Sequence, residues 1–375
     1  MRRVWFRHEG HPQPMSNRTI RIGVIGLGAI GPSHIFAIRH VKGCELAAVC
    51  DVRPDAAAQA GAEHGVPWFT QVDDLLREVA MDAVTVCTPS GYHLDAALPA
   101  IAAGKHTLVE KPLEITTARA DRIIAAARRQ GVKLAGVFQS RFSPAVQRLK
   151  ALVEAGLLGD LYSGSAYIKR YRTQQYYDSG KWRGTWAIDG GGCLMNQGIH
   201  CLDLLLWFMG EPEQVMAITE TVGRKVEVET LATALVKFAN GARGVVEGTT
   251  LAYPEFAPRI EIFGSRGSLS FTEERVVCME LMDPTPAEAR GRDKLLAEAK
   301  AIQAREARAR TKVAAGTACP SVDMGHTPII ADFADAIRND REALVNGPEA
   351  RRAVAFITAI YRSGKANGKP VRVQS

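Results

Sequence analysis

A short apolar segment that runs into a glycine-rich turn and then a helical pattern constrains this chain more than any other feature. Residues 20–26 read Ile-Arg-Ile-Gly-Val-Ile-Gly, which is typical of a buried strand, and residues 30–40 have a helical pattern. In this order Gly26 permits a tight turn, and Gly28 lets the backbone approach a pyrophosphate that the helix amides then bind. The motif predicts a dinucleotide-binding turn made of Gly26, Gly28, Ala29, Ile30 and Gly31.

An acidic residue, Asp51, follows the second expected strand, 45–50. A carboxylate in this place accepts hydrogen bonds from the adenine-ribose hydroxyls and repels a 2′-phosphate. We therefore expect NAD as the cofactor and NADP to be less favoured, with Arg53 nearby to weaken the preference. The alternative is a glycine turn that only closes a βα unit, and the strand, the helix and the carboxylate together argue against it.

Strands and helices alternate up to about residue 140, joined by short loops. This alternation is typical of a parallel, doubly wound sheet. The expected strands are 20–26, 45–50, 68–69, 83–87, 106–109 and 133–138, and the expected helices are 30–40, 54–64, 73–79, 92–103 and 116–130.

Beyond residue 140 the chain contains longer strands joined by tight turns such as Asn240-Gly241, which indicates a mostly antiparallel sheet. The fold class is therefore α/β: an N-terminal Rossmann domain with a doubly wound parallel sheet and a C-terminal α/β domain with a large open, mostly antiparallel sheet. We assign residues 1–18 to a flexible extension, 19–140 to the first domain and 141–375 to the second. In the second domain we expect strands at 161–172, 214–222, 229–239, 242–250, 258–263 and 268–271, helices at 144–155, 193–209, 327–338 and 348–363, and a charged helical insertion at about 286–312.

Composition excludes several classes of protein. With 375 residues, 46% of them apolar and 23% charged, the chain is a globular protein of more than one domain. Its seven scattered cysteines indicate reduced thiols in a cytoplasm, with no metal cage, and the chain has no apolar run of membrane-spanning length. Most of the net charge of +7 lies in residues 1–14 and 286–312, which argues against a nucleic-acid-binding face.

Two polar loops are expected to reach the cofactor, because the carboxyl ends of parallel strands line the binding crevice. Thr88-Pro89 and His93 follow the fourth strand, although a helix cap at Ser90 explains the same polar residues. Glu110-Lys111-Pro112 ends the fifth strand. A lysine there, partly desolvated beside a cationic cofactor, has a lowered pKa and can exchange a proton near neutral pH. The alternative for a Lys-Pro pair is a surface turn.

A third segment, residues 190–203, begins with three glycines that let a ligand or the other domain come close. Asn196, His200 and Asp203 follow at spacings of four and three, which places them on one stripe of a helix. A histidine in an apolar helix is usually a core residue. Next to Asn196 and the glycines, His200 is better explained as a site residue.

The chain resembles the glucose–fructose oxidoreductase / inositol dehydrogenase (Gfo/Idh/MocA) family over about residues 19–373. The resemblance implies a bound nicotinamide cofactor, hydride transfer to or from a sugar, cyclitol or related polyol, and an open sheet with substrate on one face and subunit contacts on the other. The residues that carry it are Gly26–Gly31, Thr88-Pro89, Gly104-Lys-His, Glu110-Lys111-Pro112, Arg141–Pro144, Gly190–Asp203 and Ile260–Gly267.

Asn196 stands where many members of that family have an aspartate, so the acid–base work falls on Lys111 and His200, with the choice between them open. We expect an NAD-dependent dehydrogenase that oxidises a secondary hydroxyl of a sugar, cyclitol or nucleotide-linked sugar acid, the last because residues 182–200 are similar to members that act on nucleotide-linked amino-sugar uronates. The alternatives are an NAD-requiring glycosidase or lyase and a non-catalytic regulator, and we expect a cytoplasmic homo-oligomer, a dimer or tetramer. The candidate substrate contacts are Lys111, Arg141, Tyr176, Asn196, His200 and Tyr253.

Overall fold

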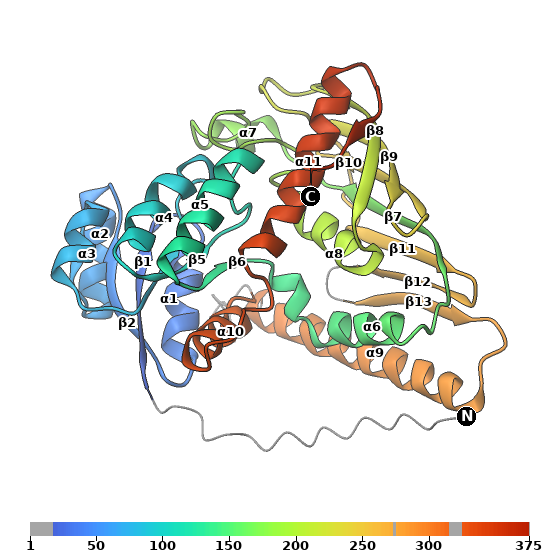
Figure 1. The fold of residues 1–375 in the computed structure, drawn as a ribbon, viewed down its shortest axis with the longest axis horizontal. Coiled ribbons are helices and arrows are strands. Elements are labelled where there is room, and N and C mark those ends of the chain that lie inside the picture. Colours follow the sequence, from blue (N-terminus) through green and yellow to red (C-terminus); the bar gives the residue numbers. More distant parts are fainter. Residues whose placement is uncertain (1–17, 273–274, 315–324, 375) are drawn as a thin grey trace.

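The computed structural model describes residues 18–272, 275–314 and 325–374. Two sheets form the framework, one for each end of the chain, and the long helix α11 (Gly347–Lys365) stands between them (Figure 1). The extension expected at 1–18 lies outside the described residues except for Arg18. No helix in the described part of the chain has both the length and the apolar character needed to cross a membrane.

The first sheet has six strands in the order β3-β2-β1-β4-β5-β6, and every adjacent pair is parallel. This is the strand order of a dinucleotide-binding Rossmann sheet, with its crevice where the order reverses beside β1 and β4. The predicted parallel sheet is therefore confirmed. Its strands are β1 (Ile20–Ile25), β2 (Cys44–Cys50), β3 (Trp68–Phe69), β4 (Ala83–Val86), β5 (His106–Val109) and β6 (Leu134–Gly136).

Helices cover both faces of this sheet, which is why its strands are apolar on both sides. Helices α3, α4 and α5 contribute to the core on one face, and α1 with α10 packs on the other, where Ile38 meets Phe333 in one buried cluster. The sequence assigned residues 327–338 to the second domain, but α10 uses its apolar face to complete the first one. These helices are α1 (Gly31–His40), α2 (Pro54–His64), α3 (Val72–Glu78), α4 (His93–Ala102), α5 (Thr117–Gln130) and α10 (Thr327–Arg338), with a short 3-10 turn at Ser90–Tyr92.

The second sheet has eight strands in the order β13-β12-β11-β7-β10-β9-β8-β14. All neighbours are antiparallel except β7 and β10, which pair in parallel. The mostly antiparallel sheet is confirmed, and β13 is a strand that the sequence analysis did not assign. The strands are β7 (Leu161–Lys169), β8 (Pro212–Glu220), β9 (Leu231–Phe238), β10 (Arg243–Thr249), β11 (Arg259–Gly264), β12 (Gly267–Thr272), β13 (Val276–Leu281) and β14 (Val371–Arg372).

Among the described residues, helices cover only one face of this sheet. Helices α8 and α11 pack on it, and side chains alternate accordingly along β9, where Ala234 and Val236 are buried while Leu235 between them is exposed. The opposite face is open in Figure 1. The remaining helices are α6 (Pro144–Glu154), α7 (Gln174–Asp178), α8 (Ile199–Met209) and α9 (Pro286–Ala314), and a 3-10 turn spans Gln139–Phe142.

Candidate functional site

The three glycines of the first βα turn have three different surroundings. Gly26 has a φ of 98°, and a Cβ there would lie 2.6 Å from the carbonyl carbon of Cys87. A Cβ on Gly31 would lie 2.5 Å from the carbonyl oxygen of Gly26, so this residue allows α1 to start close to β1. Around Gly28, in contrast, a Cβ would meet no heavy atom within 4 Å. The backbone at Gly28, followed by Ala29 and Ile30, is therefore open to a pyrophosphate.

Asp51 lies at the end of β2 and faces this turn. Its carboxylate accepts hydrogen bonds from the backbone N–H of Leu27 (2.7 Å) and from Nε of Arg53 (2.9 Å). Burial by itself would raise the pKa of Asp51, but the hydrogen bonds from Arg53 and Leu27 outweigh it and lower that pKa. Asp51 is therefore ionised at neutral pH. Arg53 is largely exposed, so its guanidinium can move aside when a ribose binds the carboxylate.

The loop after β4 brings Thr88 and Pro89 to the same end of the sheet. The hydroxyl of Thr88 is buried and has no hydrogen-bond partner among the described residues, which leaves it available to a ligand. His93 differs from the expectation: its Nδ1 lies 2.8 Å from the carbonyl oxygen of Pro112, and its Nε2 lies 2.9 Å from that of Thr88. Both nitrogens of this buried ring are engaged, so His93 connects the loop after β4 to the loop after β5. The direct cofactor contact expected from the sequence is therefore not supported.

The end of β5 places Glu110 inside the protein and Lys111 at the crevice. The Glu110 carboxylate accepts from Nε2 of His34 (2.9 Å), from Nε2 of His326 (3.0 Å) and from the backbone N–H of Lys111 (3.0 Å). The expected cofactor contact of Glu110 is therefore replaced by internal hydrogen bonds. The side chain of Lys111 points across to the second domain, where Nζ donates to the backbone carbonyl of Asn196 (3.1 Å), and the Lys111–Pro112 peptide bond is cis.

Asn196 lies in a turn and not on a helix, because α8 begins at Ile199 instead of the predicted 193. The cause is remote in sequence: the carboxylate of Glu229 accepts from the backbone N–H groups of Gly192 (2.8 Å) and Leu194 (2.9 Å) and holds this segment as a turn. The expectation that Asn196 shares one helix stripe with His200 is therefore wrong. Protein atoms occupy the space beside the glycine run: a Cβ on Gly192, for example, would meet the carbonyl oxygen of Glu229.

Asp189 is a candidate site residue that the sequence analysis missed. It is buried, it accepts from the side-chain amide of Asn196, and it accepts from the backbone N–H of Gly184 (2.9 Å). Burial raises the pKa of Asp189, while these hydrogen bonds and the charges of Lys111 and Arg183 act in the opposite direction. The only sequence signal was its position directly before the glycine run.

His200 lies in the first turn of α8. Its Nδ1 is buried and has no hydrogen-bond partner in the described part of the chain, and its ring packs edge-to-face on Phe138 at 5.7 Å. Burial, and after it the positive charge of Lys111, lowers the pKa of His200 to about 3. The ring is therefore neutral at physiological pH and offers a hydrogen-bonding nitrogen with no charge.

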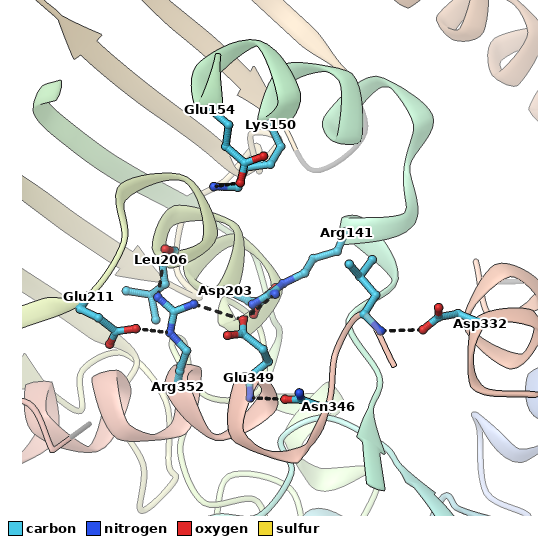
Figure 2. Close-up of polar contacts among 11 residues, drawn as sticks. Arg141, Lys150, Glu154, Asp203, Leu206, Glu211, Asp332, Asn346, Glu349 and Arg352 are labelled. Carbon is cyan, nitrogen blue, oxygen red and sulfur yellow. Dashed lines mark hydrogen bonds and ion pairs between the residues drawn. The ribbon is translucent and has the colours of Figure 1, made fainter. Parts of the chain in front are cut away.

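Arg141, one of the candidate substrate contacts, forms a buried ion pair with Asp203, which argues against that role. Two nitrogens of Arg141, Nη2 and Nε, donate to the two oxygens of Asp203 at 2.6 and 2.8 Å, and Nη1 donates to Glu349 at 2.8 Å (Figure 2). The Arg141 side chain is 1% exposed. Its guanidinium ties the 3-10 turn at 139–142 to α8 and α11, so it has no free edge for an anionic substrate group.

The two candidate tyrosines have different surroundings. Tyr176 on α7 lies near the site, because its hydroxyl accepts from Nε2 of Gln197 (3.0 Å), which also donates to Oδ1 of Asn196 (2.9 Å). The guanidinium of Arg183 stacks 4.4 Å from the centre of the Tyr176 ring. Tyr253 is 81% exposed and packs edge-to-face on Tyr171, so its role as a substrate contact stays a prediction.

Comparison with known proteins shows the family of this chain. Residues 20–138 match the model of the oxidoreductase family with an NAD-binding Rossmann fold, and residues 146–270 match the GFO/IDH/MocA C-terminal domain. The chain belongs to the Gfo/Idh/MocA oxidoreductase family. The predicted family, its fold class, the NAD cofactor and the oxidoreductase assignment are thereby confirmed.

The proteins similar to this chain have names and bound molecules that refer to different sugars and cyclitols. Myo-inositol 2-dehydrogenase of Thermotoga maritima is 30% identical over 271 residues, which covers 70% of this chain and 78% of that protein. The WlbA dehydrogenase from Bordetella pertussis, solved in complex with NADH and UDP-GlcNAcA, is 31% identical and covers 96% of this chain and 100% of that one, with a TM-score of 0.84. Levoglucosan dehydrogenase in complex with NADH and levoglucosan has a TM-score of 0.77 at 22% identity and so shares the fold.

Proposed function

We propose that this Gfo/Idh/MocA protein oxidises a secondary hydroxyl of a sugar with NAD, and that its substrate is a nucleotide-linked sugar acid. The observation that carries the proposal is the meeting of Lys111, Asn196 and His200 at the carboxyl end of the parallel sheet. Lys111 reaches Asn196 from the first domain, and the free nitrogen of His200 lies on the next helix. The open backbone at Gly28 and the unpartnered hydroxyl of Thr88 suit a dinucleotide beside them.

Oxidation of an alcohol removes a hydride from carbon and a proton from oxygen, and a carbonyl forms. A nicotinamide cofactor held at the first βα turn would supply the hydride acceptor. The protein must handle the proton, and Lys111 is the group we assign to accept it. His200 is a weak base, because burial lowers its pKa to about 3, so its neutral ring orients the hydroxyl. The side chain of Asn196 cannot take a proton, and the backbone carbonyl oxygen of this residue accepts a hydrogen bond from the Lys111 amine and holds it in place.

The substrate class rests on the charges around Tyr176. Arg183 stacks on this ring and also lies 4.6 Å from the centre of the Trp182 ring. Lys181, Lys225 and Arg183 line a shallow pocket together with the acidic residues Asp178 and Glu227, so the cations exceed the carboxylates by one. Cationic and aromatic side chains at one edge of a sugar site favour an anionic substrate that carries a base for stacking. The relative with bound UDP-GlcNAcA supports the same class.

The test is a substrate panel with NAD, followed by NADH absorbance. The panel contains UDP-GlcNAcA, the free amino-sugar acid, myo-inositol and levoglucosan. We expect turnover with UDP-GlcNAcA and a much higher KM for the free acid. Turnover only with neutral polyols would contradict the sugar-acid assignment. Release of a leaving group without net NADH would instead favour the glycosidase or lyase, and NAD binding without any turnover would favour a regulator.

We also propose that the protein is a homo-oligomer that assembles through the open face of the second sheet. Met216 on β8 and Leu235 on β9 are cross-strand neighbours, and both side chains are exposed on this face. Ile218, two residues further along β8, is exposed as well. Adjacent exposed apolar side chains on a sheet are typical of a protein–protein contact.

A further inference from the structure

A buried cluster behind Lys111 is not used by the proposed chemistry as it stands. It consists of His34 on α1, Glu110 after β5 and His326 directly before α10, and all three side chains are buried. The centres of the His34 and His326 rings lie 4.6 Å apart. His326 comes from a part of the chain more than two hundred residues after Glu110. A carboxylate with no access to water needs hydrogen-bond donors, and these two histidines provide them.

The hydrogen bonds define a direction through the cluster. Oγ1 of Thr85 lies 2.8 Å from Nδ1 of His34, and Nε2 of the same ring lies 2.9 Å from Oε1 of Glu110. Burial lowers the pKa of His34, so the ring is neutral. The ionised carboxylate of Glu110 can only accept, so Nε2 of the neutral ring carries the proton and donates to Glu110, and Nδ1 accepts from the hydroxyl of Thr85.

The second histidine donates to the same oxygen. Nε2 of His326 lies 3.0 Å from Oε1 of Glu110, while the other carboxylate oxygen, Oε2, accepts the backbone N–H of Lys111 at 3.0 Å. Burial alone would raise the pKa of Glu110, but the hydrogen bonds from His326 and His34 outweigh it and hold that pKa well below its usual value. Glu110 is thus an ionised group with one oxygen committed to the histidines and the other to the lysine backbone.

We propose that His34 and His326 are positioning residues for Lys111: by donating to one oxygen of Glu110, they orient the carboxylate so that its other oxygen fixes the backbone of the lysine at the crevice. The inference deepens the proposed function, because it assumes that Lys111 moves the proton. It also gives α10 a role in the site, since this helix packs on α1 through Ile330 and Phe333 and thereby sets His326 beside His34.

The test replaces each histidine with leucine, which removes the donor, and His326 also with glutamine, whose side-chain N–H₂ can reach the position of Nε2. With the substrate found active in the panel above, His34→Leu and His326→Leu should each lower kcat about tenfold or more, while the KM for NAD changes less than about threefold. His326→Gln should recover most of kcat. His40→Leu, on an exposed histidine of the same helix α1, is the matched control and should leave kcat unchanged.

A second readout does not depend on substrate or on the role of Lys111. Hydrogen–deuterium exchange of the peptide spanning residues 107–114 should be faster in His34→Leu and His326→Leu than in the wild type, and close to the wild type in His326→Gln and His40→Leu. If no substrate is turned over but this exchange pattern holds, the proposed function fails and the positioning role stands.

Three results would overturn the inference. The first is an equal loss of kcat in the leucine and glutamine variants of a folded protein, which would indicate packing alone. The second is unchanged exchange at residues 107–114. The third is stoichiometric zinc in the purified full-length protein that is lost in His326→Leu, because the three ligand atoms lie within 4.8 Å of one another and would then be a metal site and not a hydrogen-bonded one.

Discussion

At the scale of single residues, the burial of His200 makes Lys111 the better candidate for the base. Both lie at the crevice, but His200 is driven to the neutral form by its surroundings, and its pKa of about 3 makes it a poor proton acceptor at neutral pH. Lys111 keeps an amine that reaches the turn before α8. The question that the sequence left open, which of the two is the base, is thus decided in our proposal by desolvation and by the positive charge next to the imidazole.

This division predicts different pH–rate profiles for two variants. Lys111→Ala should lower kcat by on the order of 10²-fold or more and remove the acidic limb of kcat/KM, because a base must lose its proton before it can act. His200→Ala should also lower kcat but keep the acidic limb, since His200 does not titrate above about pH 5. A profile of each folded variant, with NAD affinity measured as a control, decides the assignment. Loss of the acidic limb in His200→Ala would reverse it.

Asn196 gives a second prediction, because its amide donates to the buried carboxylate of Asp189. In Asn196→Asp two carboxylates would face each other and raise each other's pKa, and the added charge would raise the pKa of a neighbouring cation. The acidic limb of kcat/KM should then move to higher pH. The variant should also lose stability relative to the wild type as the pH rises through the raised carboxyl pKa, because ionisation of a buried pair opposes folding.

The matched control for this variant exchanges the two groups. Asp189→Asn combined with Asn196→Asp restores one carboxylate and one amide, so its thermal unfolding between pH 5 and 8 should return towards that of the wild type. An unshifted acidic limb in Asn196→Asp, together with normal stability, would place Asn196 and Asp189 away from the reacting group.

The cofactor choice is a third prediction at this scale. NAD should bind at least about tenfold more tightly than NADP, since the ionised Asp51 faces the 2′ position and like charges repel. Arg53→Ala should widen the difference, because its guanidinium is the cation next to Asp51 that could accompany a 2′-phosphate. Titration of both cofactors into the apo-protein measures this. A lower Kd for NADP in the wild type would show that Arg53 and not Asp51 governs the site.

At the scale of elements, the ion pair of Arg141 and Asp203 joins the 3-10 turn at 139–142 to α8, and Glu349 extends it to α11 (Figure 2). Arg141→Met should destabilise the protein by about 3–5 kcal/mol, because it leaves Asp203 buried without a partner. Arg141→Met combined with Asp203→Leu should lose less. Chemical denaturation measures both. A folded Arg141→Met with wild-type stability but a raised substrate KM would restore Arg141 as a substrate contact.

Elements also show how far sequence reasoning reaches. Helix α5 begins after Thr116, whose hydroxyl accepts from the N–H of Arg119, and ends at the left-handed Gly131, so its predicted range of 116–130 agrees with the structure. These signals are local. The start of α8 was predicted six residues too early. The carboxylate of Glu229, distant in sequence, accepts hydrogen bonds from the backbone N–H groups of Gly192 and Leu194 and holds this segment as a turn. The ion pairs of Arg141 could not be predicted for the same reason, since its partners Asp203 and Glu349 are distant in sequence.

At the scale of the whole molecule, the two domains are joined by more than one connection. The chain leaves the first domain at β6, builds the second sheet, returns to the first domain with α10, and then crosses between the sheets as α11 (Figure 1). The composition of the chain gave no sign of this return. It makes the N-terminal core dependent on residues 327–338, and it brings His326 to the back of the Lys111 site.

The open face of the second sheet is the other feature of the whole molecule, and it carries the last prediction. Leu235 is 57% exposed and sits directly opposite Met216 on the neighbouring strand. If copies of the chain assemble through this face, Leu235→Lys would place a charge in a dry contact, and removal of that charge from water costs more than the contact can offset. Light scattering after size exclusion should then show a smaller species than for the wild type, with an unchanged fold by circular dichroism. Val52→Lys, at an exposed apolar position of the first domain, is the control and should keep the wild-type mass. If Leu235→Lys and the wild type have the same mass, assembly does not use this face, and the exposed side chains of β8 and β9 need another explanation.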